Sequence, residues 1–132
     1  MEQIWDPLRK KNVALTPEER VRQWFIGLLE RECGVPMHKM SSEVYMKFGD
    51  KPLRADIVVW GRTHSPLVVV ECKRPDFTLD SEVLEQALKY NMMLGAPYIA
   101  ITNGHSTYIV RRQGEKSEWL TSLPQYSQIC QQ

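Results

Sequence analysis

The amino-acid sequence predicts an α/β domain in which a mixed central sheet is flanked by helices. The chain has 132 residues, and we expect one domain over residues 1–132 with its core at about residues 16–112. Hydrophobic residues make up 42% of the chain and charged residues 25%, which is enough to bury a core. Helical and strand patterns follow in the order helix, three strands, helix, strand, strand, which is typical of a sheet with helices packed on it.

The first predicted element is a helix that begins at Thr16. Thr16 can cap the helix, and Pro17 suits its first position. Glu19 completes a capping box. Apolar residues then recur at helical spacing, at Val21, Trp24, Phe25, Leu28 and Leu29. Gly34 and Pro36 are expected to end the helix.

Three strands are predicted next, at residues 42–48, 54–60 and 67–73. Turn residues separate them at positions 49–52 and 61–66. Because the turns are short, we expect an antiparallel meander. The third strand contains four consecutive apolar residues, Leu67 to Val70, which is typical of a strand buried on both faces.

The second half of the chain predicts a helix at residues 81–94 and strands at 98–102 and 107–111. Asp80 or Ser81 can cap the helix, while Gly95 and Pro97 are expected to end it. A helix that joins two strands of one sheet normally makes them parallel, so the strand at 98–102 should run parallel to the strand at 67–73. The segment after residue 112 carries no clear pattern.

Composition argues against several classes of protein. The three cysteines, Cys33, Cys72 and Cys130, have neither the spacing of a zinc site nor the number of a disulfide framework. The N-terminus lacks the pattern of a signal peptide, and no apolar run is long enough to span a bilayer. We therefore expect a cytoplasmic protein without a membrane partner. The net charge of +1 neither requires nor excludes a nucleic-acid partner.

Charged residues near the ends of two neighbouring predicted strands are the candidates for chemistry. Because alternate side chains of a strand share a face, Asp56 is expected on the same face as Val58 and opposite to Ala55. By the same rule, Glu71 and Lys73 share a face of the next strand. Ionised groups among apolar neighbours are costly unless they are paired or bind a metal. These residues are therefore interpreted either as a metal site or as salt bridges at strand ends.

The metal-site interpretation gives each group a separate role. The carboxylates of Asp56 and Glu71, with the main-chain carbonyl of Cys72, would suit Mg²⁺ (or Mn²⁺), which prefers oxygen ligands. Such a cation polarises a phosphate and lowers the pKa of a bound water. Lys73 would orient that water and stabilise charge on the phosphate oxygens.

Gln86 and Tyr90 form a second candidate pair. They stand four residues apart in the second predicted helix, so they share one face and can reach one target. They are interpreted either as groups that position a phosphate or the metal ligands, or as an amide and a phenol at the edge of the core.

Together these segments resemble a known nuclease family. The runs Arg54-Ala55-Asp56-Ile57-Val58-Val59 and Val68-Val69-Val70-Glu71-Cys72-Lys73-Arg74-Pro75 resemble the PD-(D/E)xK nuclease motif. More narrowly, Gln86-x-x-x-Tyr90 and the turn Ile101-Thr102-Asn103-Gly104 are similar to the N-terminal nuclease domain of type I restriction enzyme R subunits. The opening at residues 17–23 is similar to the start of small stand-alone relatives. The resemblance covers roughly residues 16–110.

The resemblance implies a restriction-endonuclease-like αβββαβ core and a Mg²⁺-dependent DNA endonuclease that hydrolyses phosphodiester bonds. Asp56 and Glu71 would be metal ligands, and Lys73 a catalytic base or electrostatic helper. A further glutamate from the first part of the fold sometimes joins the metal; Glu43 is the first candidate and Glu30 the second.

The large members of this family carry an ATP-driven motor after the nuclease. This chain contains no G-x-x-x-x-G-K-[ST] motif, so no ATP site is expected in it. We expect DNA as the partner, together with restriction-modification subunits or a second copy of the chain. Two alternatives stay open: a non-catalytic nucleic-acid-binding or protein-interaction module that retains the fold, and a structural domain whose charged residues form a buried ion network.

Overall fold

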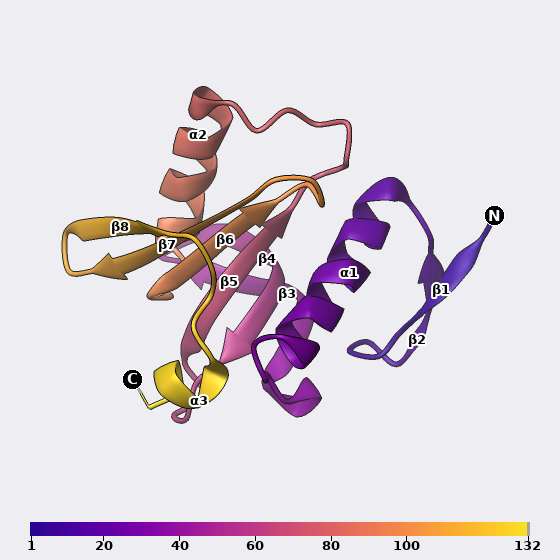
Figure 1. Cartoon of the computed structure of the whole chain (residues 1–132), viewed down its shortest axis with the longest axis horizontal. Coiled ribbons are helices and arrows are strands. Elements are labelled where there is room, and N and C mark those ends of the chain that lie inside the picture. Colours follow the sequence, from indigo (N-terminus) through magenta and orange to yellow (C-terminus); the bar gives the residue numbers. More distant parts are fainter. Residues whose placement is uncertain (132) are drawn as a thin grey trace.

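The computed structural model describes residues 1–131, and a six-stranded mixed sheet forms its centre (Figure 1). The elements are β1 (Gln3–Asp6), β2 (Lys11–Ala14), α1 (Pro17–Arg31), a 3₁₀ turn η1 (Met37–Lys39), β3 (Met40–Phe48), β4 (Lys51–Trp60), β5 (Pro66–Cys72), α2 (Ser81–Met92), β6 (Tyr98–Thr102), β7 (Thr107–Gln113), β8 (Lys116–Leu120) and α3 (Tyr126–Ile129). The predicted mixed sheet with flanking helices is confirmed.

The strands of the sheet follow their order in the sequence, from β3 to β8. The β3–β4 and β4–β5 pairs are antiparallel, as the short turns predicted. The β5–β6 pair is parallel, because α2 carries the chain back along the sheet between these two strands. β7 and β8 complete the sheet as antiparallel strands.

Helices cover both faces of the sheet (Figure 1). Phe25 and Leu29 of α1 pack in one core cluster with Val68 and Val70 of β5. Val69 belongs to a second cluster, which contains residues of α2. The apolar run of β5 is thus buried on both faces, and its alternation directs the side chains to the two helical layers.

Local signals placed the first helix correctly. The side chain of Thr16 caps α1 by accepting a hydrogen bond from the Glu19 N–H at 3.1 Å. Gly34 has a φ of +70°, a backbone conformation that glycine adopts readily, and it lies just beyond the helix. None of the helices in the described chain is long and apolar enough to cross a membrane.

The N-terminal hairpin and the last elements had no clear pattern in the sequence. β1 and β2 pair with each other outside the main sheet, and most of their residues are exposed. α3 is fixed by contacts from distant segments: the Tyr126 hydroxyl donates to the Trp60 carbonyl at 2.9 Å, and the Gln125 amide donates to the Glu32 carbonyl at 2.6 Å. Such long-range partners leave no periodic pattern for sequence reasoning to find.

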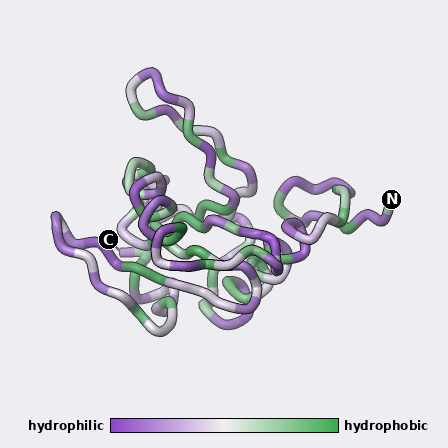
Figure 2. The backbone as a smooth tube through the Cα atoms, turned by 90° about the horizontal axis from the view of Figure 1, so that it is seen from above, coloured by the Kyte–Doolittle hydropathy of each residue, from purple (hydrophilic) through white to green (hydrophobic). Residues whose placement is uncertain are grey.

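β3 and β4 extend beyond the rest of the sheet as a two-stranded ribbon. β4 pairs with β5 from Ile57 onward, whereas its earlier residues pair only with β3. In the view from above, this ribbon stands away from the body of the molecule (Figure 2).

The side chains of β4 do not alternate regularly where the ribbon begins. Ala55 lies in the same cluster as Val58. Across from this part of β4, Glu43 of β3 has a φ of +49°. The prediction that Ala55 and Val58 lie on opposite faces is therefore wrong, since both side chains belong to the α2-side cluster.

Candidate active site

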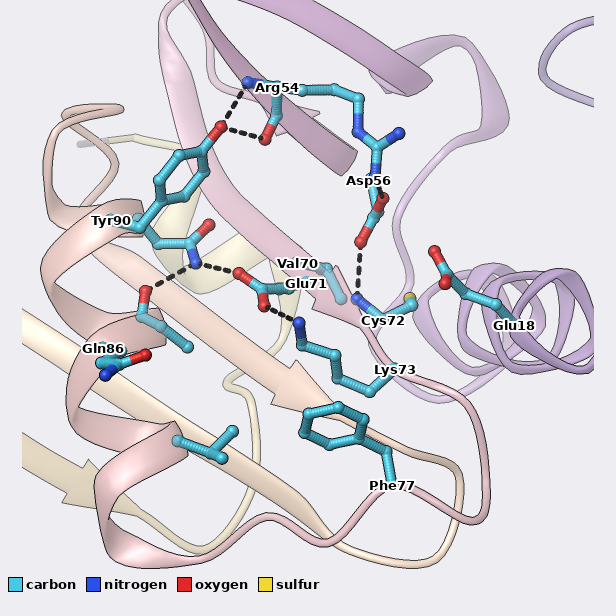
Figure 3. A pocket seen from close by; sticks show the side chains of 13 residues that line it. Glu18, Arg54, Asp56, Val70, Glu71, Cys72, Lys73, Phe77, Gln86 and Tyr90 are labelled. Carbon is cyan, nitrogen blue, oxygen red and sulfur yellow. Dashed lines mark hydrogen bonds and ion pairs between the residues drawn. The ribbon is translucent and has the colours of Figure 1, made fainter.

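A cleft of about 500 Å³ opens between the middle of β4, the end of β5 and one face of α2 (Figure 3). All five predicted catalytic residues line it: Asp56, Glu71, Lys73, Gln86 and Tyr90. The two strands supply Asp56 and Glu71, the loop after β5 supplies Lys73, and α2 supplies the amide and the phenol. The tertiary fold thus brings residues from positions 56 to 90 to one surface.

Asp56 is buried at the point where β4 and β5 separate. Its side chain is 5% exposed, and its Oδ2 accepts a hydrogen bond from the Cys72 N–H at 2.7 Å. The Arg54 guanidinium donates to the other oxygen at 3.2 Å. Burial raises the pKa of Asp56 above its ordinary value, although the Cys72 N–H and the nearby guanidinium groups oppose this rise. The carboxylate therefore lies in a setting where a further positive charge would stabilise its ionised form.

Glu71 is held from two sides. The Asn91 amide donates to Oε1 at 2.8 Å, and the Lys73 Nζ lies 3.0 Å from Oε2. Asn91 is 1% exposed and also donates to the Ala87 carbonyl at 2.7 Å, so its amide is fixed. The ammonium group of Lys73 also lies 5.1 Å from the centre of the Phe77 ring, a cation–π contact. The sequence analysis missed Asn91, which the helix places one residue beyond Tyr90.

Gln86 and Tyr90 line the same cleft from α2 but differ in their contacts. The Tyr90 hydroxyl accepts from the Arg54 N–H at 2.8 Å and lies 3.3 Å from the carbonyl of the same residue, to which it donates. Tyr90 therefore fastens α2 to β4 two residues before Asp56. Gln86 is exposed and makes no hydrogen bond within the described residues, so its amide is available to a ligand.

The glutamate that the fold brings to the cleft is Glu18, in the first turn of α1. Burial raises its pKa, and the charge of Asp56 acts in the same direction. Glu43, the first candidate from the sequence, instead pairs with Arg9 at 3.1 Å and is not among the residues that line the cleft. Glu30 is exposed on α1 and does not line it either. Glu18 lies next to Glu19 in the first turn of the helix that Thr16 caps, so its position in the sequence indicated only the start of a helix and no role in a site.

Arg22 is a third residue that the sequence analysis missed, after Asn91 and Glu18. It is 4% exposed, and its Nη2 lies 3.5 Å from Glu43 and 3.9 Å from Asp56. Its Nε and Nη1 atoms have no hydrogen-bond partner among the described residues. The sequence does contain a signal for Arg22. It precedes Phe25 by three residues and Ile26 by four, so it is a charged residue on the apolar face of the helix.

The donor groups of the cleft fit a hard cation. Asp56 and Glu71 offer carboxylate oxygens, and they lie close enough for the charge of Glu71 to act to raise the pKa of Asp56. The thiol of Cys72 is not such a donor, since it packs in the α1-side cluster and burial raises its pKa well above the ordinary value. In residues 1–131, no three or more His, Cys, Asp or Glu side chains are gathered as a metal-binding group. The two carboxylates would need main-chain or water oxygens to complete a coordination shell.

The fold and the cleft define a class of domain: a mixed sheet with helices on both faces, and two acids and a lysine where two central strands separate. The chain belongs to the family described as type I restriction enzyme R protein N terminus, whose model matches residues 17–124.

One solved structure is similar to this chain over most of its length. It is a fragment described as an HsdR subunit of a type I restriction enzyme from Vibrio vulnificus YJ016. The similarity has a TM-score of 0.61 and 21% sequence identity, and it covers 90% of this chain and 25% of that chain. This likeness shows the shared fold. No curated protein sequence matches the chain.

Proposed function

We propose that this chain is a metal-dependent DNA endonuclease domain of the PD-(D/E)xK type, which hydrolyses phosphodiester bonds. One observation carries the proposal: Asp56, Glu71 and Lys73 line the same cleft, although they come from two strands and the loop that follows. Membership of the restriction enzyme R family supports DNA as the substrate. The proposed setting is restriction-modification, with further subunits or a second copy of the chain as partners.

Asp56 and Glu71, with the main-chain carbonyl of Cys72, would hold Mg²⁺ or Mn²⁺. The bound cation would supply Lewis-acid polarisation of the phosphate and a lowered pKa for its water. Glu18 is the candidate for an additional carboxylate, because it lines the cleft from α1. Glu43 is the weaker candidate, since Arg9 and Arg22 already neutralise it.

Among the remaining residues of the cleft, two would contact the DNA and two would hold the catalytic groups in place. Lys73 would stabilise negative charge on the phosphate oxygens, and its contact with Glu71 holds the ammonium group in the cleft. Asn91 would keep the Glu71 carboxylate in one orientation. Tyr90 would fix the backbone that precedes Asp56, and Gln86 would donate to a phosphate.

The test is cleavage of plasmid and linear DNA by wild type and Lys73→Ala, with Mg²⁺, Mn²⁺ or EDTA. We expect metal-dependent cleavage by wild type and a loss of about 10²–10³-fold in Lys73→Ala, the range typical of a single electrostatic donor. Lys89→Ala is the matched control, because Lys89 is exposed on α2 and pairs with Glu85 outside the cleft. Equal cleavage by wild type and Lys73→Ala would refute the proposal.

A second function, a non-catalytic nucleic-acid-binding or protein-interaction module, is favoured by the pairing of the charged groups. Both oxygens of Glu71 have partners, and so do both oxygens of Asp56. A closed ion network of this kind would take up no cation. Titration calorimetry with Mn²⁺ separates the two functions: a metal site gives heat that Asp56→Asn abolishes, whereas a closed network gives none in either protein.

A further inference from the structure

The β3–β4 ribbon carries positive charge that the protein itself does not neutralise. Between Val44 and Ala55 it contains the cations Lys47, Lys51 and Arg54 and one acid, Asp50 at the turn. The two acids at its base, Glu43 and Asp56, are paired with arginines. Neither Lys47 nor Lys51 forms an ion pair with any residue in 1–131. The ribbon therefore presents free cations on a segment that stands away from the body (Figure 2).

Cross-strand pairing assigns these residues to the two faces of the ribbon. Directly opposed residues share a face, so Tyr45 lies beside Arg54, and Lys47 lies on the same face two pairs closer to the tip. Tyr45 is 71% exposed on that face. The opposite face begins with Val44 and Met46, which are partly buried against the α2-side cluster. We call the face with Tyr45, Lys47 and Arg54 the basic face of the ribbon.

The basic face runs into the cleft. Arg54 belongs to both, since it lines the cleft and donates to Asp56 at 3.2 Å. Tyr90 holds the backbone of Arg54, which fixes the direction in which the ribbon leaves the cleft. A polyanion bound at Asp56 and Lys73 would therefore meet Arg54, then Tyr45, then Lys47.

We propose that the basic face of the β3–β4 ribbon binds the backbone of duplex DNA beside the cleft. This inference rests on the proposed function in that it takes DNA to be the ligand of the cleft. The five residues from Val44 to Phe48 span four steps along the strand, or about 14 Å at the usual rise per residue. That length matches about four base pairs at 3.4 Å each.

Duplex DNA fits this face better than a single strand. Binding of unpaired bases relies on successive aromatic side chains over which the bases stack. The basic face carries one exposed aromatic side chain, Tyr45, because Phe48 pairs with Lys51 on the opposite face. Two exposed cations and a two-stranded ribbon, which the major groove can admit, suit the phosphates and groove of a duplex.

The test measures binding by fluorescence anisotropy in EDTA, so that no cleavage occurs, with a labelled duplex and a single strand of the same sequence. We expect wild type to prefer the duplex. Lys47→Gln should lower the magnitude of the salt slope, d log K/d log[salt], by about 0.9, the contribution of one phosphate contact to B-DNA. Tyr45→Ala should weaken duplex binding without changing that slope. Lys116→Gln, an exposed lysine at the β7–β8 turn, is the matched control and should bind as wild type does.

Three results would overturn the proposal: no duplex binding by wild type at low salt, equal salt slopes for wild type and Lys47→Gln, or tighter binding of the single strand. Thermal unfolding of each variant checks that the fold is intact. The assay is independent of catalysis. A protein that fails to cleave DNA with metal but loses duplex affinity in Lys47→Gln would refute the endonuclease and leave the ribbon proposal standing.

Discussion

Replacing Asn91 with alanine removes two hydrogen bonds from the wall of the cleft. The Asn91 amide donates to Glu71 Oε1 at 2.8 Å and to the Ala87 carbonyl at 2.7 Å. A hydrogen bond to a charged group contributes about 1.5–3 kcal/mol, and one between neutral groups about 0.5–1.5 kcal/mol. Because Asn91 is 1% exposed, water does not readily replace either bond. We expect Asn91→Ala to lower the free energy of unfolding by about 2–4 kcal/mol.

Urea unfolding followed by circular dichroism measures this loss as a lower midpoint with an unchanged m-value. Asn12→Ala, at an exposed position on β2, is the control and should leave the midpoint unchanged. A double-mutant cycle with Glu71→Ala isolates the contact between the two side chains, for which we expect a coupling of about 1.5–3 kcal/mol. A coupling near zero would refute the reasoning, because Asn91 would then not orient Glu71.

Two further predictions concern other contacts. Tyr90→Phe should lower the free energy of unfolding by about 0.5–1.5 kcal/mol, since it removes the hydrogen bonds to the Arg54 backbone, and an unchanged urea midpoint would contradict this. In the wild type, Arg9 helps to hold the pKa of Asp6 below its ordinary value of 3.8, although burial of the carboxyl group acts to raise it. Asp6→Asn removes this negative partner of Arg9. A depressed carboxyl pKa stabilises the fold above 3.8, and this contribution is lost as the pH falls through the depressed value. Wild type should therefore be more stable than Asp6→Asn at neutral pH, and the difference should shrink below pH 4; a gap that stays constant with pH would contradict the assignment.

The pattern of the sequence predicted most of the sheet because the relevant interactions are local. The cap of α1 lies within four residues, from Thr16 to Glu19. The apolar run at residues 67–70 marked a strand with helices on both sides. The helix between β5 and β6 indicated that these two strands run parallel, and the structure confirms it.

The candidate site was predictable in part for the same reason. Asp56 and Glu71 lie on two strands joined by one short turn and Lys73 follows the second strand directly, so the topology alone brought the three together. The roles of these residues in catalysis and metal binding stay predictions. Glu18, Asn91 and Arg22 were missed, because each meets the site only through packing against a different element.

The sequence by itself determined the order of the main elements, the direction of the central strands and the strands that carry the acids. Only the tertiary structure decided which charged side chains meet: Glu18 lines the cleft, Glu43 pairs with Arg9, and Lys47 and Lys51 of the ribbon form no ion pair with residues 1–131. The physical reason is the distance along the chain over which each interaction acts. Propensity, capping and turn geometry act between neighbours in the chain, whereas the partner of a charged group is set by distances that arise only when helices and strands pack together.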